Sequence, residues 1–147
     1  METSSAIRTS VARASERMRV MTEEMVSSRD SPARWSKKEV LGHLIDSAGN
    51  NLQRIVRAQL TAELRFPSYM QTEWVAAQQY VSEEWIDLLD LWIAINRHLA
   101  HVIDQVPDSA LRTMCRIGDS GPVTLEALIA DYVRHMEHHL RQIDPQF

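Results

Sequence analysis

The sequence predicts an all-α protein, a four-helix bundle that forms a single domain over residues 1–147. The 147 residues contain only 4 glycines, and the alternation of β-branched residues that is typical of strands is absent from the pattern. Apolar residues instead recur at intervals of three and four in four segments. Four long helices in a chain of this size are typical of a four-helix bundle.

The first helix is expected in the opening segment, where apolar residues from Ile7 to Met25 step by three and four. Its Arg- and Ser-rich start has the composition of a transit peptide, but its acidic residues and the continuing apolar stripe favour an ordinary helix. The segment SRDSPARW then predicts a loop. In WSKKEV, Ser36 and Glu39 form a capping box that starts the second helix, which is expected to end near Leu60.

Two further helices are expected, each after an irregular segment. A long connection, TAELRFPSYMQTEWVAAQQYV, joins the second helix to the third and is expected to contain a short helical piece. Ser82, followed by two glutamates, predicts the start of the third helix, which Pro107 ends. The glycines and proline of IGDSGPVT predict tight turns, after which Thr124 caps a last helix that reaches about Ile143.

Composition excludes several classes of protein. The net charge is −4 and no run of lysine and arginine forms a basic patch, so we expect no nucleic-acid partner. No apolar run approaches the roughly 20 residues of a membrane span, so we expect no membrane partner. The single cysteine, Cys115, excludes an internal disulfide and a cysteine-based zinc cage and suits the cytoplasm. Nothing nearby would lower its pKa, so we expect it to be inert.

The stretch RHMEHHLRQI contains three histidines within five residues of the last helix. Plotted at about 100° per residue, His135 and His139 lie on one flank of the apolar stripe, whereas His138 lies on the solvent face. Two imidazoles one turn apart can bind one metal ion, but a structural or solvated pair fits equally well. A zincin is excluded because Met136 stands where its glutamate is needed, and a zinc deaminase because no P-C-x-x-C follows.

A third ligand would have to come from another helix. The second helix carries a polar stripe at one-turn spacing, formed by His43, Ser47, Asn50 and Arg54. Helical angles alone favour a solvated face for this stripe; the functional alternative is the lining of a wet cleft. His98 and His101, three residues apart, have no accompanying polar stripe, and we expect them to border the core without binding metal.

Two motifs resemble the DinB-like superfamily of metal-binding four-helix bundles. They are W-S-x-x-E-x-x-x-H-x-x-D-S in the second helix and H-x3-H-x2-Q-I in the last, and the likeness extends from about Ala6 to Ile143. Members bind a divalent metal through one histidine of the second helix and the pair of the last. The resemblance therefore implies His43, His135 and His139 as ligands of Zn or Ni. The helical angles select the final pair independently, whereas His43 depends on the resemblance.

The resemblance also implies a function. Members include metal-dependent hydrolases and transferases that join a low-molecular-weight thiol to an electrophile, and many are homodimers. Both reactions act on a small molecule and need a metal with open coordination positions. The alternatives are a module that binds metal or a small molecule without catalysis, and a structural bundle with incidental histidines. In a structural bundle, His43 would lie away from the final pair.

Further site residues are expected in the long connection and on the second helix. The connection offers aromatic and polar groups to cover a cleft, namely Tyr69, Gln71, Glu73, Trp74 and Gln78. Glu73 is the candidate general base. Asn50 and Arg54 are candidates to bind an anionic part of a substrate, although Arg54 equally fits a structural salt bridge. Asp46 and Asp131 could orient ligating histidines, or could be ordinary surface carboxylates.

Overall fold

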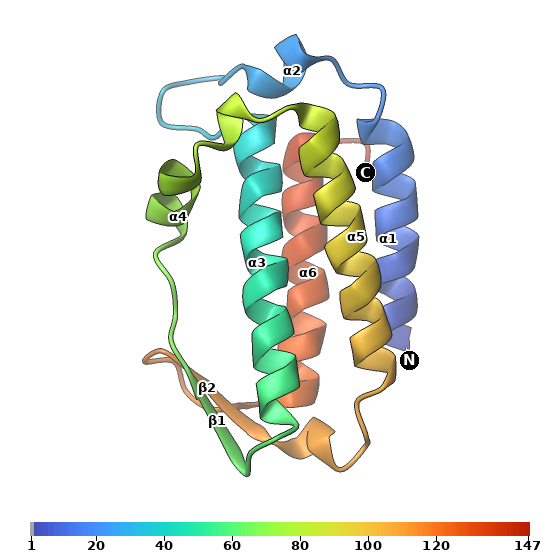
Figure 1. Cartoon of the computed structure of the whole chain (residues 1–147), viewed down its shortest axis with the longest axis vertical. Helices are drawn as coiled ribbons and strands as arrows, with labels where there is room; N and C mark the ends of the chain where they lie inside the picture. The colour runs from blue at the N-terminus through green and yellow to red at the C-terminus, as the bar shows by residue number, and fades with distance from the viewer. Residues whose placement is uncertain (1) are drawn as a thin grey trace.

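The computed structural model describes residues 2–147, in which four long helices form an elongated bundle (Figure 1). The long helices are α1 (Glu2–Met18), α3 (Lys37–Ala58), α5 (Trp85–Asp104) and α6 (Leu125–Ile143). The short helices are α2 (Glu23–Ser27), α4 (Gln71–Gln78) and the 3-10 turns Tyr80–Ser82 and Ala110–Arg112. Three strands complete the fold, β1 (Glu63–Phe66), β2 (Met114–Ile117) and β3 (Val123–Thr124).

Each long helix packs against two others. Helices α1 and α3 both contact α5 on one side and α6 on the other. In Figure 1, α1 and α6 run upward whereas α3 and α5 both run downward. Because α3 and α5 run in the same direction, residues 59–84 return along the outside of α3, and this segment includes β1 and α4.

The core is formed by the apolar stripes of the four long helices. On α6 every residue of the predicted stripe is buried, namely Leu125, Leu128, Ile129, Tyr132, Met136, Leu140 and Ile143. Removing this surface from water is the main favourable term in folding. Within residues 2–147, no helix is at once long enough and apolar enough to cross a bilayer.

The predicted starts of α3 and α6 are confirmed. The backbone N–H of Glu39 donates to Ser36 Oγ at 3.2 Å, and the Ser36 N–H donates to Glu39 Oε1 at 3.0 Å, which completes the capping box. The N–H of Ala127 donates to Thr124 Oγ1 at 3.2 Å. Both caps follow from side chains close in sequence, which is why the sequence predicts them.

The opening segment forms two helices where one was predicted. Helix α1 ends at Met18, and Thr22 caps α2 by accepting from the N–H of Met25. The indole Nε1 of Trp85 donates to the Met18 carbonyl at 2.8 Å. This long-range bond satisfies a carbonyl that the end of a helix leaves without a partner, and the apolar periodicity does not reveal it.

The start of α5 also differs from the prediction. Ser82 lies in a 3-10 turn and donates to the Gln79 carbonyl, whereas α5 begins at Trp85. The Trp85 N–H donates to Glu23 Oε1 at 2.6 Å, so a carboxylate of α2 accepts from the first turn of α5. A cap that comes from a distant segment leaves no local signal in the sequence.

The all-α prediction is incomplete, because a small sheet closes one end of the bundle (Figure 1). Strand β1 is parallel to β2, with Leu64 opposite Cys115, and β2 is antiparallel to β3. Strands of two to four residues are too short to show a period-two pattern. One predicted turn is confirmed at Gly118, which has a φ of 56° and donates its N–H to the Phe66 carbonyl.

Substituting Gly42 should destabilise the protein, because the ring of Tyr80 crosses α3 at this position. A Cβ at residue 42 would lie 2.1 Å from Tyr80 Cδ2, so the ring must move in Gly42→Ala. We expect the free energy of unfolding to fall by about 1 to 3 kcal/mol. The measurement is urea denaturation followed by circular dichroism.

Gly49→Ala is the matched control on the same helix. Nothing lies within 4 Å of a Cβ at Gly49, so this variant should gain up to about 1 kcal/mol from helix propensity. Equal stability of the two variants would show that the Tyr80 ring does not constrain position 42.

Candidate metal centre

Three histidine side chains converge between α3 and α6. His43 comes from α3, and His135 and His139 come from successive turns of α6; one nitrogen from each ring lies within 4.8 Å of the others. His43 Nε2 lies 3.1 Å from His135 Nε2. His43 is 0% exposed and the other two are half-buried. The expectation of a solvated face, which helical angles favoured for the stripe, is therefore wrong for His43.

Helix α3 buries His43 because it is covered on several sides. It packs against α5 and α6 in the bundle, and against α2, α4 and β1 outside it. A side chain that lies off the apolar line of Leu41 and Leu44 therefore still meets protein instead of water. On α6, buried Met136 and Leu140 lie next to the two histidines and hold the helix against the core.

Burial keeps the imidazoles neutral. It lowers the pKa of His43 to about 4, and the neighbouring His139 and His135 rings act in the same direction. Burial, aided by His139, likewise lowers the pKa of His135 to about 4. Burial also lowers the pKa of His139. At pH 7 the three rings are neutral, which is the form in which a ring nitrogen can bind a metal.

The donor set fits a divalent transition metal. Two imidazole nitrogens that bind one ion at about 2.0–2.1 Å lie about 2.9–3.4 Å apart in octahedral or tetrahedral coordination. The 3.1 Å between His43 Nε2 and His135 Nε2 lies in this range. Neutral nitrogen ligands suit Zn or Ni, whereas Ca and Mg prefer oxygen. Three protein ligands also leave coordination positions open, as in catalytic sites.

The outer ring nitrogens have different surroundings. His139 Nδ1 lies 2.8 Å from Gln142 Oε1, so the amide oxygen can accept Nδ1–H and leave Nε2 for a metal. His135 Nδ1 lies 3.5 Å from Ser47 Oγ. His43 Nδ1 is buried and has no hydrogen-bond partner within residues 2–147. The ring of Trp35 packs against the His43 ring, with 5.2 Å between the ring centres.

A cavity of about 530 Å³ reaches the triad at His135. Its α3 wall is formed by Ser47, Asn51 and Arg54, and the segment that returns along α3 contributes Tyr69 and Gln71. Opposite them, α6 contributes Asp131, Tyr132 and Arg134. A second cavity, of about 720 Å³, reaches the other flank of the triad at His139 and is lined there by Trp35, Thr72 and Gln142.

The sequence profile of the DinB superfamily matches residues 6–143 of the chain. The protein belongs to the DinB superfamily. No curated protein sequence matches it. The assignment agrees with the resemblance noted from the two histidine motifs.

Two solved structures share the fold. YfiT from Bacillus subtilis, a probable metal-dependent hydrolase with an unusual four-helix bundle topology, is 19% identical with a TM-score of 0.85. The match covers 97% of this chain and 82% of YfiT. A mycothiol-dependent maleylpyruvate isomerase is 12% identical with a TM-score of 0.78, and the match covers 97% of this chain and 60% of the isomerase. At such identities the likeness shows the fold alone.

In this DinB-superfamily protein, several side chains predicted for the site line the cavity beside the triad or pack next to it. Arg54, Tyr69 and Gln71 line the cavity, and Trp74 packs against Tyr69 with 4.9 Å between ring centres. Cys115 also lines the cavity; burial raises the pKa of its thiol, which keeps it protonated at neutral pH.

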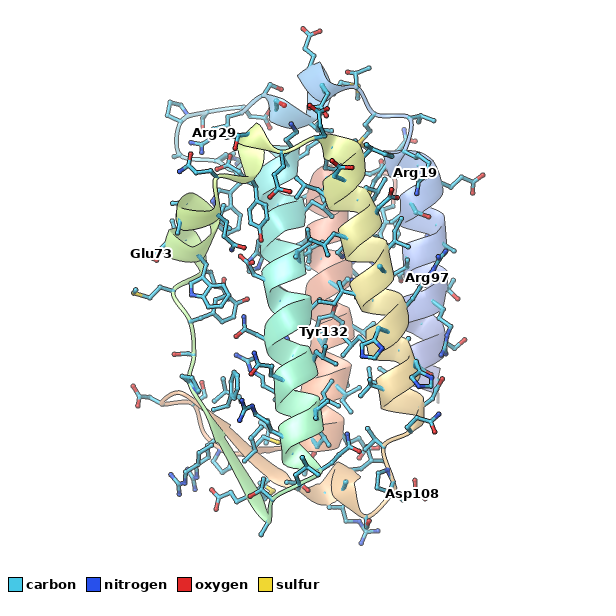
Figure 2. All side chains as sticks on the ribbon, viewed as in Figure 1. Arg19, Arg29, Glu73, Arg97, Asp108 and Tyr132 are labelled. Atoms are coloured by element: carbon cyan, nitrogen blue, oxygen red, sulfur yellow. The ribbon has the colours of Figure 1, made fainter. Side chains whose placement is uncertain are left out.

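Other predicted residues lie elsewhere. Glu73 is exposed on α4 and is not among the residues of the cavity wall (Figure 2). Asn50 is buried and donates to the Asp46 carbonyl at 2.9 Å, while its neighbour Asn51 lines the cavity. His98 and His101 are exposed on α5, and His138 is exposed on α6, so none of them joins the triad.

Two contacts of the triad were not predicted from the sequence. Gln142 belongs to the H-x3-H-x2-Q-I motif but received no role, although its position one turn after His139 is a usable signal. Trp35, directly before the Ser36 cap, was not predicted to belong to the site. Its ring instead covers His43, a contact that depends on the path of the preceding loop.

Neither acidic candidate orients a histidine. Asp131 pairs with Arg134 at 2.9 Å on the surface. Asp46 Oδ1 accepts from Gln78 Nε2 at 2.7 Å and from the Tyr80 hydroxyl at 2.6 Å. Burial raises the pKa of Asp46, and these two hydrogen bonds oppose the rise. Asp46 therefore anchors the segment that returns along α3.

Removing the Tyr80 hydroxyl should loosen this segment. Tyr80→Phe deletes a hydrogen bond to a buried carboxylate, and we expect the free energy of unfolding to fall by about 1 to 3 kcal/mol. Amide hydrogen exchange in α4 should become faster, because Asp46 keeps only Gln78 as a partner from that segment. Ser82→Ala, which removes one exposed local hydrogen bond, is the control. Unchanged exchange in α4 of Tyr80→Phe would contradict the anchoring role.

Proposed function

We propose that the protein is a divalent-metal enzyme that hydrolyses a small molecule, with His43, His135 and His139 as the metal ligands. The observation that carries the proposal is the convergence of three neutral imidazoles at the end of a cavity. The fold shared with YfiT supports it. We further propose Zn or Ni as the metal and the cytoplasm as the compartment, since the single cysteine is a free buried thiol.

A metal bound by these histidines supplies a Lewis acid, which polarises a carbonyl or makes a water or thiol more acidic. The chain itself supplies the surroundings. Trp35 and the packing around α3 keep water from His43, and Gln142 fixes the orientation of His139. Among the residues that line the cavity, Asp131 is the one carboxylate, so it is our candidate to accept a proton there. Glu73, the general base expected from the sequence, has no catalytic role in this proposal.

Transfer of a small thiol is the second candidate, and the two cavities favour it. One cavity reaches the triad at His135 and the other at His139. A thiol and an electrophile could therefore approach the same centre from two sides, whereas hydrolysis needs one organic substrate and water. The mycothiol dependence of the structurally similar isomerase is consistent with this reaction.

A structural bundle with incidental histidines is poorly supported, because that alternative expects His43 to lie away from the final pair. The structure instead has 3.1 Å between His43 Nε2 and His135 Nε2. A binding module without catalysis uses the same three ligands, so a measurement of turnover is needed to distinguish it from an enzyme.

Metal content tests the ligand set. Elemental analysis of protein purified without an affinity tag should find near-stoichiometric Zn or Ni, and the double variant His135→Ala/His139→Ala should fall to background. His138→Ala is the matched control, since His138 lies on the same helix but is exposed, and it should keep its metal. A wild-type protein that is metal-free and takes up none of the supplied Zn or Ni would show that the proposed site is wrong.

Turnover with and without a thiol separates the reactions. The metal-loaded protein should hydrolyse members of a panel of small esters and amides without any thiol, and a chelator should abolish this activity. Activity on electrophiles that requires an added low-molecular-weight thiol would favour transfer instead. Bound metal with neither activity across the panels would indicate a binding module.

A further inference from the structure

Arg54 is a cation in the cavity wall without an anionic partner. No carboxylate within residues 2–147 forms an ion pair with it, so the structural salt bridge considered for Arg54 is not present. Its Nε is buried and lacks a hydrogen-bond acceptor. The Phe66 ring, 5.5 Å from Arg54 Cζ, covers part of the guanidinium. A buried donor without an acceptor is costly unless another molecule satisfies it.

The charge of the cavity differs from that of the whole protein. Its charged wall residues are Arg54, Arg134 and Asp131. Arg134 Nη2 lies 2.9 Å from Asp131 Oδ1, so these two charges offset each other. The positive charge of Arg54 is left uncompensated. The chain as a whole has a net charge of −4. An uncompensated cation in a concave, partly dry site attracts anions.

Arg54 also has a defined position relative to the triad. Ser47, Asn51 and Arg54 are spaced by one turn on the cavity side of α3, and Ser47 Oγ lies 3.5 Å from His135 Nδ1. At a rise of about 1.5 Å per residue, Arg54 lies about 10 Å from Ser47 and about 16 Å from His43 along the helix axis. Helical side chains lean toward the N-terminus, which brings the guanidinium closer to the triad.

We propose that Arg54 binds a carboxylate of the substrate while the reacting end of the same molecule lies at the three histidines. The inference rests on the proposed metal function and narrows its substrate class to an elongated carboxylate, whose chain spans the distance from Arg54 to the triad. A carboxylate can accept from the planar guanidinium through two oxygens, which gives orientation as well as affinity.

Thiols with and without a carboxylate provide the test. The protein is loaded with Co²⁺ in place of its metal, and binding is followed through the cobalt–thiolate charge-transfer band. One ligand series is the straight-chain ω-mercaptocarboxylates with about three to eleven carbons, and the other is the neutral ω-mercaptoalcohols of equal length. At the best length, we expect the carboxylate to bind at least about tenfold more tightly than its neutral partner.

Arg54→Gln should reduce this preference to less than about twofold, whereas Arg57→Gln should keep it. Arg57 is a matched control because it lies one turn further along α3 and near the same Phe66 ring, but is exposed and bonds to Gln53. Thermal unfolding checks that both variants fold. If Arg54→Gln does not fold, the comparison of the two ligand series on the wild-type protein still tests whether the cavity prefers a carboxylate.

The outcomes are distinguishable. Thiols that bind cobalt with no preference for the carboxylate, or a preference that Arg57→Gln loses as fully as Arg54→Gln, would overturn the role of Arg54 and leave the metal site intact. Cobalt uptake without any thiolate band would overturn the inferred path from the cavity to the metal. Failure to take up cobalt would overturn the metal site and the inference together.

Discussion

The convergence of three imidazoles between α3 and α6 is the constraint on which the rest of the structure depends. Two ring nitrogens, on the fully buried His43 and the half-buried His135, lie 3.1 Å apart. Two lone pairs at this distance repel unless a proton or an ion lies between them. The surrounding contacts fix the rings in place, since Gln142 holds one side of His139 and Trp35 covers His43. The site is thus preorganised by packing before any ligand binds.

The path of the chain creates the cavity beside these rings. Because α3 and α5 run in the same direction, residues 59–84 have to return along the outside of α3, where β1 and α4 pack against it. The small size of Gly42 lets the Tyr80 ring approach the helix, and the Tyr80 hydroxyl reaches the buried Asp46. The long helices therefore position the histidines, and the returning segment supplies the outer wall of the cavity.

Features set by local rules could be predicted from the sequence, and features set by distant contacts could not. The apolar stripe of α6 and the caps at Ser36 and Thr124 depend on residues within a few positions of each other. The start of α5 depends instead on Glu23, far away in the chain. In the site, helical angles predict that His135 and His139 lie together on one flank of the apolar stripe of α6. The burial of His43 could not be predicted from helical angles, because α3 is covered on several sides. His43 was predicted as a ligand from the family resemblance alone.

The uncompensated charges proposed for the site are all positive. A divalent ion held by these three neutral imidazoles would keep its full charge, because no carboxylate belongs to the ligand set within residues 2–147. Arg54 adds a second cation without an anionic partner in the wall of the cavity that reaches the triad. A half-buried guanidinium without an anionic partner and three partly desolvated imidazoles cost stability, and a protein selected for stability alone would pair or replace them. Local departures of this kind, in an otherwise consistent helical bundle, are expected where a site binds a ligand, and here the sign of the charges favours an anion.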